Sequence, residues 1–105
     1  MNETNPLFIS VLELRVLCDR LLKHLSEVEG EGVQIERDYF WSIPDEDLYD
    51  VYSEPETFTV GQVSESIGHL RALLADESIR PTRHIVWLAE VLRAIGTPAA
   101  RRAIE

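Results

Sequence analysis

The sequence contains one cysteine, five glycines and no long hydrophobic run. A single cysteine, Cys18, cannot form an intramolecular disulfide, and no Cys/His spacing is that of a structural zinc site. The glycines do not approach the spacing of a phosphate-binding or dinucleotide-binding loop. The first residues lack a basic segment followed by an unbroken apolar run, so neither a signal peptide nor a membrane span is expected. We therefore expect a cytoplasmic protein without cofactor or bound metal.

Basic side chains are scarce in the middle of the chain. Residues 27–56 hold eleven acidic side chains against Arg37 alone, whereas acids and bases nearly balance elsewhere, and the net charge is −9. Such a negative segment repels nucleic acid phosphates and attracts basic protein surfaces. We expect a protein partner with a basic surface, and neither nucleic acid nor membrane as partner.

Length and composition predict one helical domain over residues 1–105, since 45% of the residues are hydrophobic and one core suffices for this size. A long amphipathic helix is predicted from Pro6 to Glu29, with Asn5 as its N-cap and Gly30 as its stop. Its apolar positions recur every three or four residues: Leu7, Val11, Leu14, Leu17, Leu21, Leu25 and Val28. Further apolar residues widen this face, so the helix is either covered on two sides or also packs against a second copy, as a homodimer through the first helix.

Later helices are predicted from capping residues and periodicity. Thr59 and Gln62 match a capping box, so a helix is expected from there to about Ala75. Pro81 begins a further helix that ends at Gly96, and a short fourth helix is expected over residues 97–103. The predicted fold class is all-α, a bundle of three to four helices with a long acidic, aromatic loop between the first and second main helices.

The alternative fold class adds a small β-ladder. Residues 33–36 and 57–60 alternate apolar and polar side chains, which is typical of two short paired strands. Between them, Pro44 followed by three acids predicts a helical turn, because carboxylates suit the amino-terminal end of a helix.

The loop at residues 38–58 holds six of the eight aromatic residues: Tyr39, Phe40, Trp41, Tyr49, Tyr52 and Phe58. We expect Phe40, Trp41 and Phe58 to close the open end of the bundle. The remaining tyrosines lie among carboxylates, a combination typical of binding hot spots for basic partners. The predicted partner-binding residues are Asp45, Asp47, Tyr49, Asp50 and Tyr52.

Catalysis is the less favoured interpretation of the same segment. The carboxylates at 45, 46, 47 and 50 could serve a metal-dependent enzyme, but their spacing does not match an EF-hand loop, which requires glycine where Asp50 stands. Ser66 and His69 lie three residues apart on one predicted helix, a spacing that is common by chance. No catalytic residue is therefore predicted, and Cys18 is expected to be a small buried hydrophobe.

The motifs DYFWSIP, LYDVYSEP and TVGQVSESIGHL, which span residues 38–70, resemble a family of small bacterial helical proteins of unknown function. Asp47-Leu48 with Tyr49 and Tyr52 is also loosely similar to the acidic helix of nuclease-toxin immunity proteins, which occludes a toxin. In this chain the tyrosines are separated rather than adjacent. The second resemblance implies an inhibitor that binds a basic protein.

Three functions follow as hypotheses. The first is a non-enzymatic, acidic interaction module, such as an inhibitor or immunity-type partner of a basic protein. The second is a small metal-dependent enzyme that uses the carboxylates of residues 45–50, and the third is a structural homodimer.

Overall fold

The structure, a computed structural model, describes residues 6–104, and for residues 99–104 only the course of the backbone. The described part contains four helices and a small two-stranded antiparallel sheet, so the predicted mostly helical fold class with a ladder is confirmed. None of the described helices is long and apolar enough to cross a membrane. The chain divides into two compact units, residues 1–34 and 35–105, and each is described by itself. A single domain stays a prediction.

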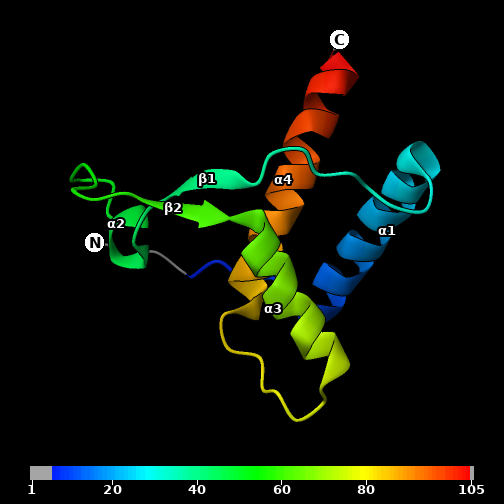
Figure 1. Ribbon diagram of the computed structural model, residues 1–105, viewed down its shortest axis with the longest axis horizontal. Coiled ribbons are helices and arrows are strands. Elements are labelled where there is room, and N and C mark those ends of the chain that lie inside the picture. The colour runs from blue at the N-terminus through cyan, green and yellow to red at the C-terminus, as the bar shows by residue number, and fades with distance from the viewer. Residues whose placement is uncertain (1–5, 105) are drawn as a thin grey trace. The chain divides into compact units, whose positions relative to one another are not determined.

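The first unit consists of helix α1, Val11–Glu29, and its flanking segments (Figure 1). The predicted start at Pro6 is wrong, because the Ser10 hydroxyl accepts a hydrogen bond of 3.0 Å from the Glu13 amide and caps the helix there. Asn5 lies outside the described residues. Gly30 ends the helix as predicted, at a φ of 85° that favours glycine. No side chain of α1 is buried, and Cys18 is exposed rather than buried as expected.

The ladder in the second unit pairs β1, Tyr39–Ser42, with β2, Thr59–Gln62. In its register Phe40 lies opposite Gly61, and Trp41 lies opposite Val60. The predicted second strand overlaps β2, but the predicted first strand at residues 33–36 is wrong. The strand forms a few residues later, where consecutive aromatic side chains suit a pleated surface.

Helix α2, Asp45–Leu48, follows β1 and precedes β2 in the chain, and it confirms the helical turn predicted after Pro44. The Pro44 carbonyl accepts hydrogen bonds from the amides of Asp47 at 3.0 Å and Leu48 at 2.9 Å. Three carboxylates occupy its first turn, where the helix dipole favours negative charge.

Helices α3, Val63–Ala75, and α4, His84–Ile104, follow β2 and pack against each other. The predicted capping box is wrong, because residues 59–62 are strand and the Thr59 hydroxyl donates to the Ser42 carbonyl at 3.4 Å. The predicted stop at Gly96 is also wrong, since α4 runs through Pro98 as one helix. A proline keeps a φ that suits a helix and removes one hydrogen bond.

The contact between α3 and α4 is partly polar. Val63, 4% exposed, is the one buried hydrophobic side chain among the described residues. Ser66, buried at the same contact, donates a hydrogen bond of 2.7 Å to Glu90. His69 stacks on Trp87 with ring centroids 3.9 Å apart. The second unit is therefore held by a helix pair with a small core and by the ladder attached to α3.

The aromatic residues of the ladder do not close a bundle as predicted. Trp41 is 74% exposed and Phe58 is 56% exposed, and their rings meet edge to face at 6.0 Å. Phe40 is half-buried and lies against Gly61 on the other face of the ladder. Strand alternation explains the difference, because neighbouring residues of β1 point to opposite faces and only one face is covered.

The close approach of the Phe40 ring to residue 61 requires glycine at that position, and substitution of Gly61 tests this requirement. A Cβ at position 61 would lie 2.7 Å from Cε2 of Phe40 and closer still to Cζ. We expect Gly61→Ala to lower the free energy of unfolding by about 1–3 kcal/mol, as overpacking does, and Phe40→Leu to restore part of the loss. Urea unfolding followed by circular dichroism measures both.

Gly68→Ala is the matched control. Position 68 is exposed on α3 and a Cβ there meets nothing within 4 Å, so alanine should stabilise the helix by about 0.5–1 kcal/mol. If Gly61→Ala were as stable as the wild-type protein, the close packing of Phe40 on β2 would be incorrect.

Candidate functional site

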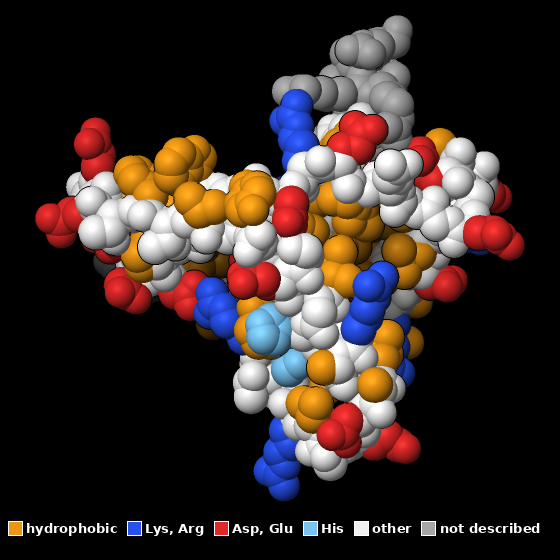
Figure 2. All heavy atoms as spheres, in the orientation of Figure 1, with side chains coloured by type: hydrophobic (Ala, Val, Ile, Leu, Met, Phe, Trp, Pro, Cys, Tyr) orange, Lys and Arg blue, Asp and Glu red, His pale blue; other side chains and the backbone are white. Residues whose placement is uncertain are grey.

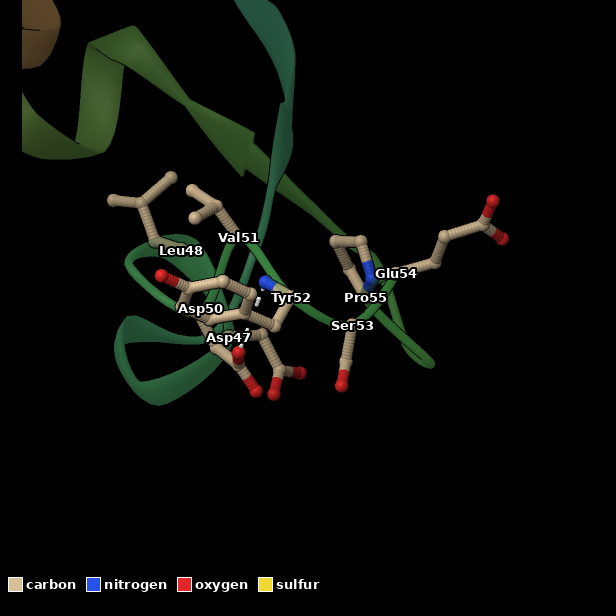
Figure 3. A pocket seen from close by; sticks show the side chains of 8 residues that line it. All are labelled: Asp47, Leu48, Asp50, Val51, Tyr52, Ser53, Glu54 and Pro55. Carbon is tan, nitrogen blue, oxygen red and sulfur yellow. Dashed lines mark hydrogen bonds between the residues drawn. The ribbon is translucent and has the colours of Figure 1, made fainter.

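The acidic turn, which we define as residues 45–54, consists of α2 and the turn that follows it. Its tyrosines are almost fully exposed, Tyr49 at 85% and Tyr52 at 97%. Figure 3 shows the carboxylates of Asp47 and Asp50 pointing to the same side, while Leu48 and Val51 point to the other side. The Asp50 carboxylate also accepts a hydrogen bond of 3.2 Å from the Tyr52 amide. Two negative charges and two exposed rings therefore share one short turn.

Asp45 has a different environment from the other predicted residues of this turn. Its carboxylate oxygens accept hydrogen bonds of 2.8 and 3.2 Å from the two terminal nitrogens of Arg83, next to α4. These hydrogen bonds, and then the positive charge of Arg83, hold the pKa of Asp45 below its usual value. The same hydrogen bonds, and then the negative charge of Asp45, raise the pKa of Arg83. Exposed ion pairs contribute little to stability. The pair does orient the acidic turn relative to α4, so Asp45 acts here as a tether.

A recess of about 410 Å³ lies on the acidic turn, lined by Asp47, Leu48, Asp50, Val51, Tyr52, Ser53, Glu54 and Pro55 (Figure 3). It is open to solvent and its lining side chains come from one continuous segment. Catalysis by paired carboxylates relies on environments that separate their pKa values, usually through burial. An open recess of this kind is suited to contact with another surface.

No group of three or more His, Cys, Asp or Glu side chains is arranged to hold a metal ion in the part of the chain that the structure describes. The carboxylates at 45, 47 and 50 thus do not converge, because Asp45 turns toward Arg83. A metal-dependent activity receives no support from their geometry.

Asp38 is a structural residue of this region that the sequence did not reveal. Its carboxylate accepts hydrogen bonds from the Ser64 amide at 2.7 Å and from the Ser64 hydroxyl at 2.9 Å, 26 residues further along. Its carbonyl accepts a bond of 2.7 Å from the Val63 amide. These two amides belong to the first turn of α3 and have no partner within the helix. Asp38 therefore caps α3 from a distant segment and closes the base of the loop.

The hydrogen bonds of the Asp38 cap also lower the pKa of the Asp38 carboxyl group. Hydrogen bonds from Ser64, first from its amide and then from its hydroxyl, hold the pKa of Asp38 below the ordinary value of 3.8. Gln62 adds a weaker bond from its side-chain amide at 3.4 Å. Each of these donors favours the ionised carboxylate. The negative charge of Asp38 thus serves hydrogen bonds within the fold.

A second, smaller recess of about 170 Å³ lies where the ladder meets α3 and α4. It contains Ser66 and His69, which the sequence placed three residues apart, together with Glu90 and Trp87. The Ser66 hydroxyl donates a hydrogen bond to Glu90, and His69 stacks on Trp87. The Ser66 hydroxyl is thus directed to the Glu90 carboxylate and not to His69, so Ser66 and His69 do not form a pair with each other.

Comparison of the chain with models of protein families, with curated proteins and with solved structures found no match. The resemblance of residues 38–70 to a small bacterial family therefore stays a prediction, as does the looser similarity to immunity proteins.

The Asp38 cap predicts a specific loss of stability in acid. A carboxyl whose pKa is lower in the folded than in the unfolded protein stabilises the fold while ionised, so its contribution is complete above its unfolded pKa and disappears as the pH falls through its folded pKa. We expect Asp38→Asn to lower the melting temperature at pH 7 by several degrees. The difference from the wild-type protein should shrink below pH 3.8. Thermal melts across the acid range measure it.

Asp47→Asn is the control, since it makes the same chemical change on the exposed acidic turn. It should leave the melting temperature at pH 7 close to that of the wild-type protein. Equal effects of the two substitutions would show that Asp38 has no special part in capping α3.

Proposed function

We propose that the protein is a non-enzymatic interaction module that binds a basic protein through Asp47, Tyr49, Asp50 and Tyr52, with Asp45 as the tether of that surface. The observation that supports this best is the arrangement of the acidic turn. Two carboxylates point to one side of a short turn that also exposes both tyrosine rings. The ladder and the ion pair with Arg83 connect the turn to the helices.

The carboxylates and the tyrosine rings of the acidic turn contribute to binding in different ways. The carboxylates attract a basic surface and orient it during approach, an effect that raises the rate of association and weakens with salt. Tyrosine rings contribute large contact area at a small cost in side-chain entropy, which is why tyrosine is enriched in binding hot spots. The proposed partner therefore presents lysine or arginine side chains beside a surface that can cover two rings.

An inhibitor or immunity-type role is the more specific form of this proposal. It rests on the loose similarity of Asp47-Leu48, Tyr49 and Tyr52 to the acidic helix of nuclease-toxin immunity proteins. The exposure of both tyrosines and the negative charge of residues 27–56 agree with such a role. In this form the turn occupies a basic active site and blocks it.

Self-association through α1 is a second candidate, and one observation favours it. The helix carries apolar side chains at helical spacing over its length, yet none of its residues is buried. An isolated helix of this length is marginal in water, and most of the stability of a protein helix comes from packing of its apolar face. A homodimer that covers this face would supply such packing.

Reversing the charge of the acidic turn tests the leading proposal. We expect Asp47→Lys with Asp50→Lys to reduce recovery of the native partner by tenfold or more, because like charges then face each other across the interface. The protein would be immobilised in a lysate of its native host, and the retained proteins identified and quantified by mass spectrometry at about 0.05 and about 0.5 M salt. Those that depend on the turn should be basic and salt-sensitive.

The control is Glu36→Lys with Glu77→Lys, the same change of charge at two exposed acids of the second unit. It should leave the partner bound. If both double variants retained the same proteins, the acidic turn would not be the binding surface, and if both lost them equally, only the net charge would matter.

The homodimer makes its own prediction. Sedimentation of the free protein should show a dimer, and Leu21→Glu, in the middle of the apolar face of α1, should convert it to a monomer with the second unit still folded. A wild-type protein that stays monomeric at high concentration would contradict self-association through α1.

A further inference from the structure

The outer face of the ladder carries a patch of apolar side chains, which we call the ladder patch: Tyr39, Trp41, Phe58 and Val60. Trp41 and Val60 are directly opposite each other in the ladder. Tyr39 and Phe58 are two residues away from them along β1 and before β2, and so belong to the same face. All four side chains are between 56% and 74% exposed. The covered face of the ladder, by contrast, holds Phe40 and Gly61.

The ladder patch is large for a surface that faces water. Antiparallel sheets commonly cover one face and keep polar residues on the other. Here the uncovered face has three aromatic side chains, each of about 150–250 Å², and more than half of each is exposed. Together they expose several hundred Å², the size at which an apolar patch usually marks an interaction site.

The patch is continuous in the chain with the acidic turn. β1 leads through Pro44 into α2, and the chain returns from the turn to Phe58 and β2. Figure 2 shows hydrophobic side chains gathered over the ladder and acidic side chains around its far end. An apolar centre with a charged surround is the usual composition of a protein interface.

We propose that the ladder patch is the apolar half of the interface whose charged half is the acidic turn. Its occupant is an amphipathic segment of the basic partner, with apolar side chains against Trp41 and Phe58 and lysine or arginine side chains against Asp47 and Asp50. This inference rests on the proposed function and adds the chemistry of the partner: a basic surface alone does not suffice.

Charge argues for a different protein rather than a second copy on this patch. The segment that contains the ladder patch lies within or next to residues 27–56, where eleven acids face Arg37 alone. Two copies joined through this face would bring these negative segments together without neutralising them. A basic partner covers the rings and offsets the charge at the same time.

Three synthetic peptides of equal length test the inference against the full-length chain by calorimetry. The first alternates lysine with leucine and phenylalanine, the second keeps the lysines and replaces the apolar residues by serine, and the third replaces the lysines of the first by glutamate. We expect the first to bind at least about tenfold more tightly than the second, and the third not to bind.

Substitutions in the full-length chain then test which peptide side chains bind the ladder patch and which bind the acidic turn. Trp41→Thr, which keeps a strand-forming side chain, should weaken the first peptide to the level of the second. Val60→Thr should weaken the first peptide less, and both substitutions should leave the second peptide unchanged. Asp47→Lys with Asp50→Lys should weaken both peptides. Leu74→Gln is the matched control, since Leu74 is an exposed leucine on α3, and it should weaken neither. Circular dichroism confirms that each variant is folded. If Trp41→Thr unfolds the protein, the nearly isosteric Val60→Thr takes its place in the binding measurement.

The outcomes separate this inference from the proposed function. Equal affinity of the first and second peptides, both still dependent on Asp47 and Asp50, would overturn the ladder patch and leave the acidic turn standing. Binding of the first peptide that ignores the charge reversal would overturn the proposed function, and no binding of either basic peptide would overturn both. A wild-type dimer that Trp41→Thr converts to monomer would assign the patch to a second copy and overturn the inference.

Discussion

The carboxylate and carbonyl of Asp38 bind the first turn of α3, and the ladder and the acidic turn depend on this contact. It satisfies two helix amides that have no partner within α3 and fixes the start of β1 to the end of β2. A loop of this length has a considerable closure entropy, and the ladder by itself has only four residues in each strand. A two-stranded hairpin of that size is marginal without further support. The helix cap is that support, together with the packing of Phe40 on Gly61.

A second tether lies at Asp45, further along the loop than Asp38. The ion pair of Asp45 with Arg83 connects α2 to the beginning of α4. Tyr39 and Trp41 of the ladder patch lie between the two tethers in the chain, and the acidic turn begins at the second tether. Because both tethers use aspartates, the acidic character of residues 27–56 has two physical functions. Asp38 caps α3 and Asp45 orients the acidic turn. Asp47 and Asp50 carry the charge of the turn beside the exposed tyrosines, which is the arrangement that the proposed function requires.

The sequence predicted what depends on local pattern. Apolar spacing located α1, α3 and α4, and Pro44 with its acids located α2, because helix-forming signals act within a few residues. The start of α1 was also readable, since Ser10 and Glu13 have the capping-box spacing that we assigned to Thr59 and Gln62. The latter pair has the same pattern but lies in a strand, because the aromatic residues of β1 provide a partner for pairing. Tertiary context thus outweighed a local signal.

Contacts between distant residues escaped prediction. No sequence pattern connects Asp38 with Ser64 or Asp45 with Arg83, so two acids with structural functions were indistinguishable from those on the surface. The face to which Trp41 and Phe58 point depends on the register of β1, and a shift of one residue exchanges the two faces of a strand. The acidic turn was predicted because charge and tyrosine content are local properties, and its tether and the neighbouring ladder patch were not.

Amide hydrogen exchange, followed residue by residue by NMR, tests most directly whether Asp38 holds this region together. In the wild-type protein the Ser64 amide and the paired amides of β1 and β2 should exchange slowly. In Asp38→Ala they should exchange together and much faster, while amides in the middle of α4 stay slow. A wild-type Ser64 amide that exchanges as fast as that of Gly32 would contradict the account.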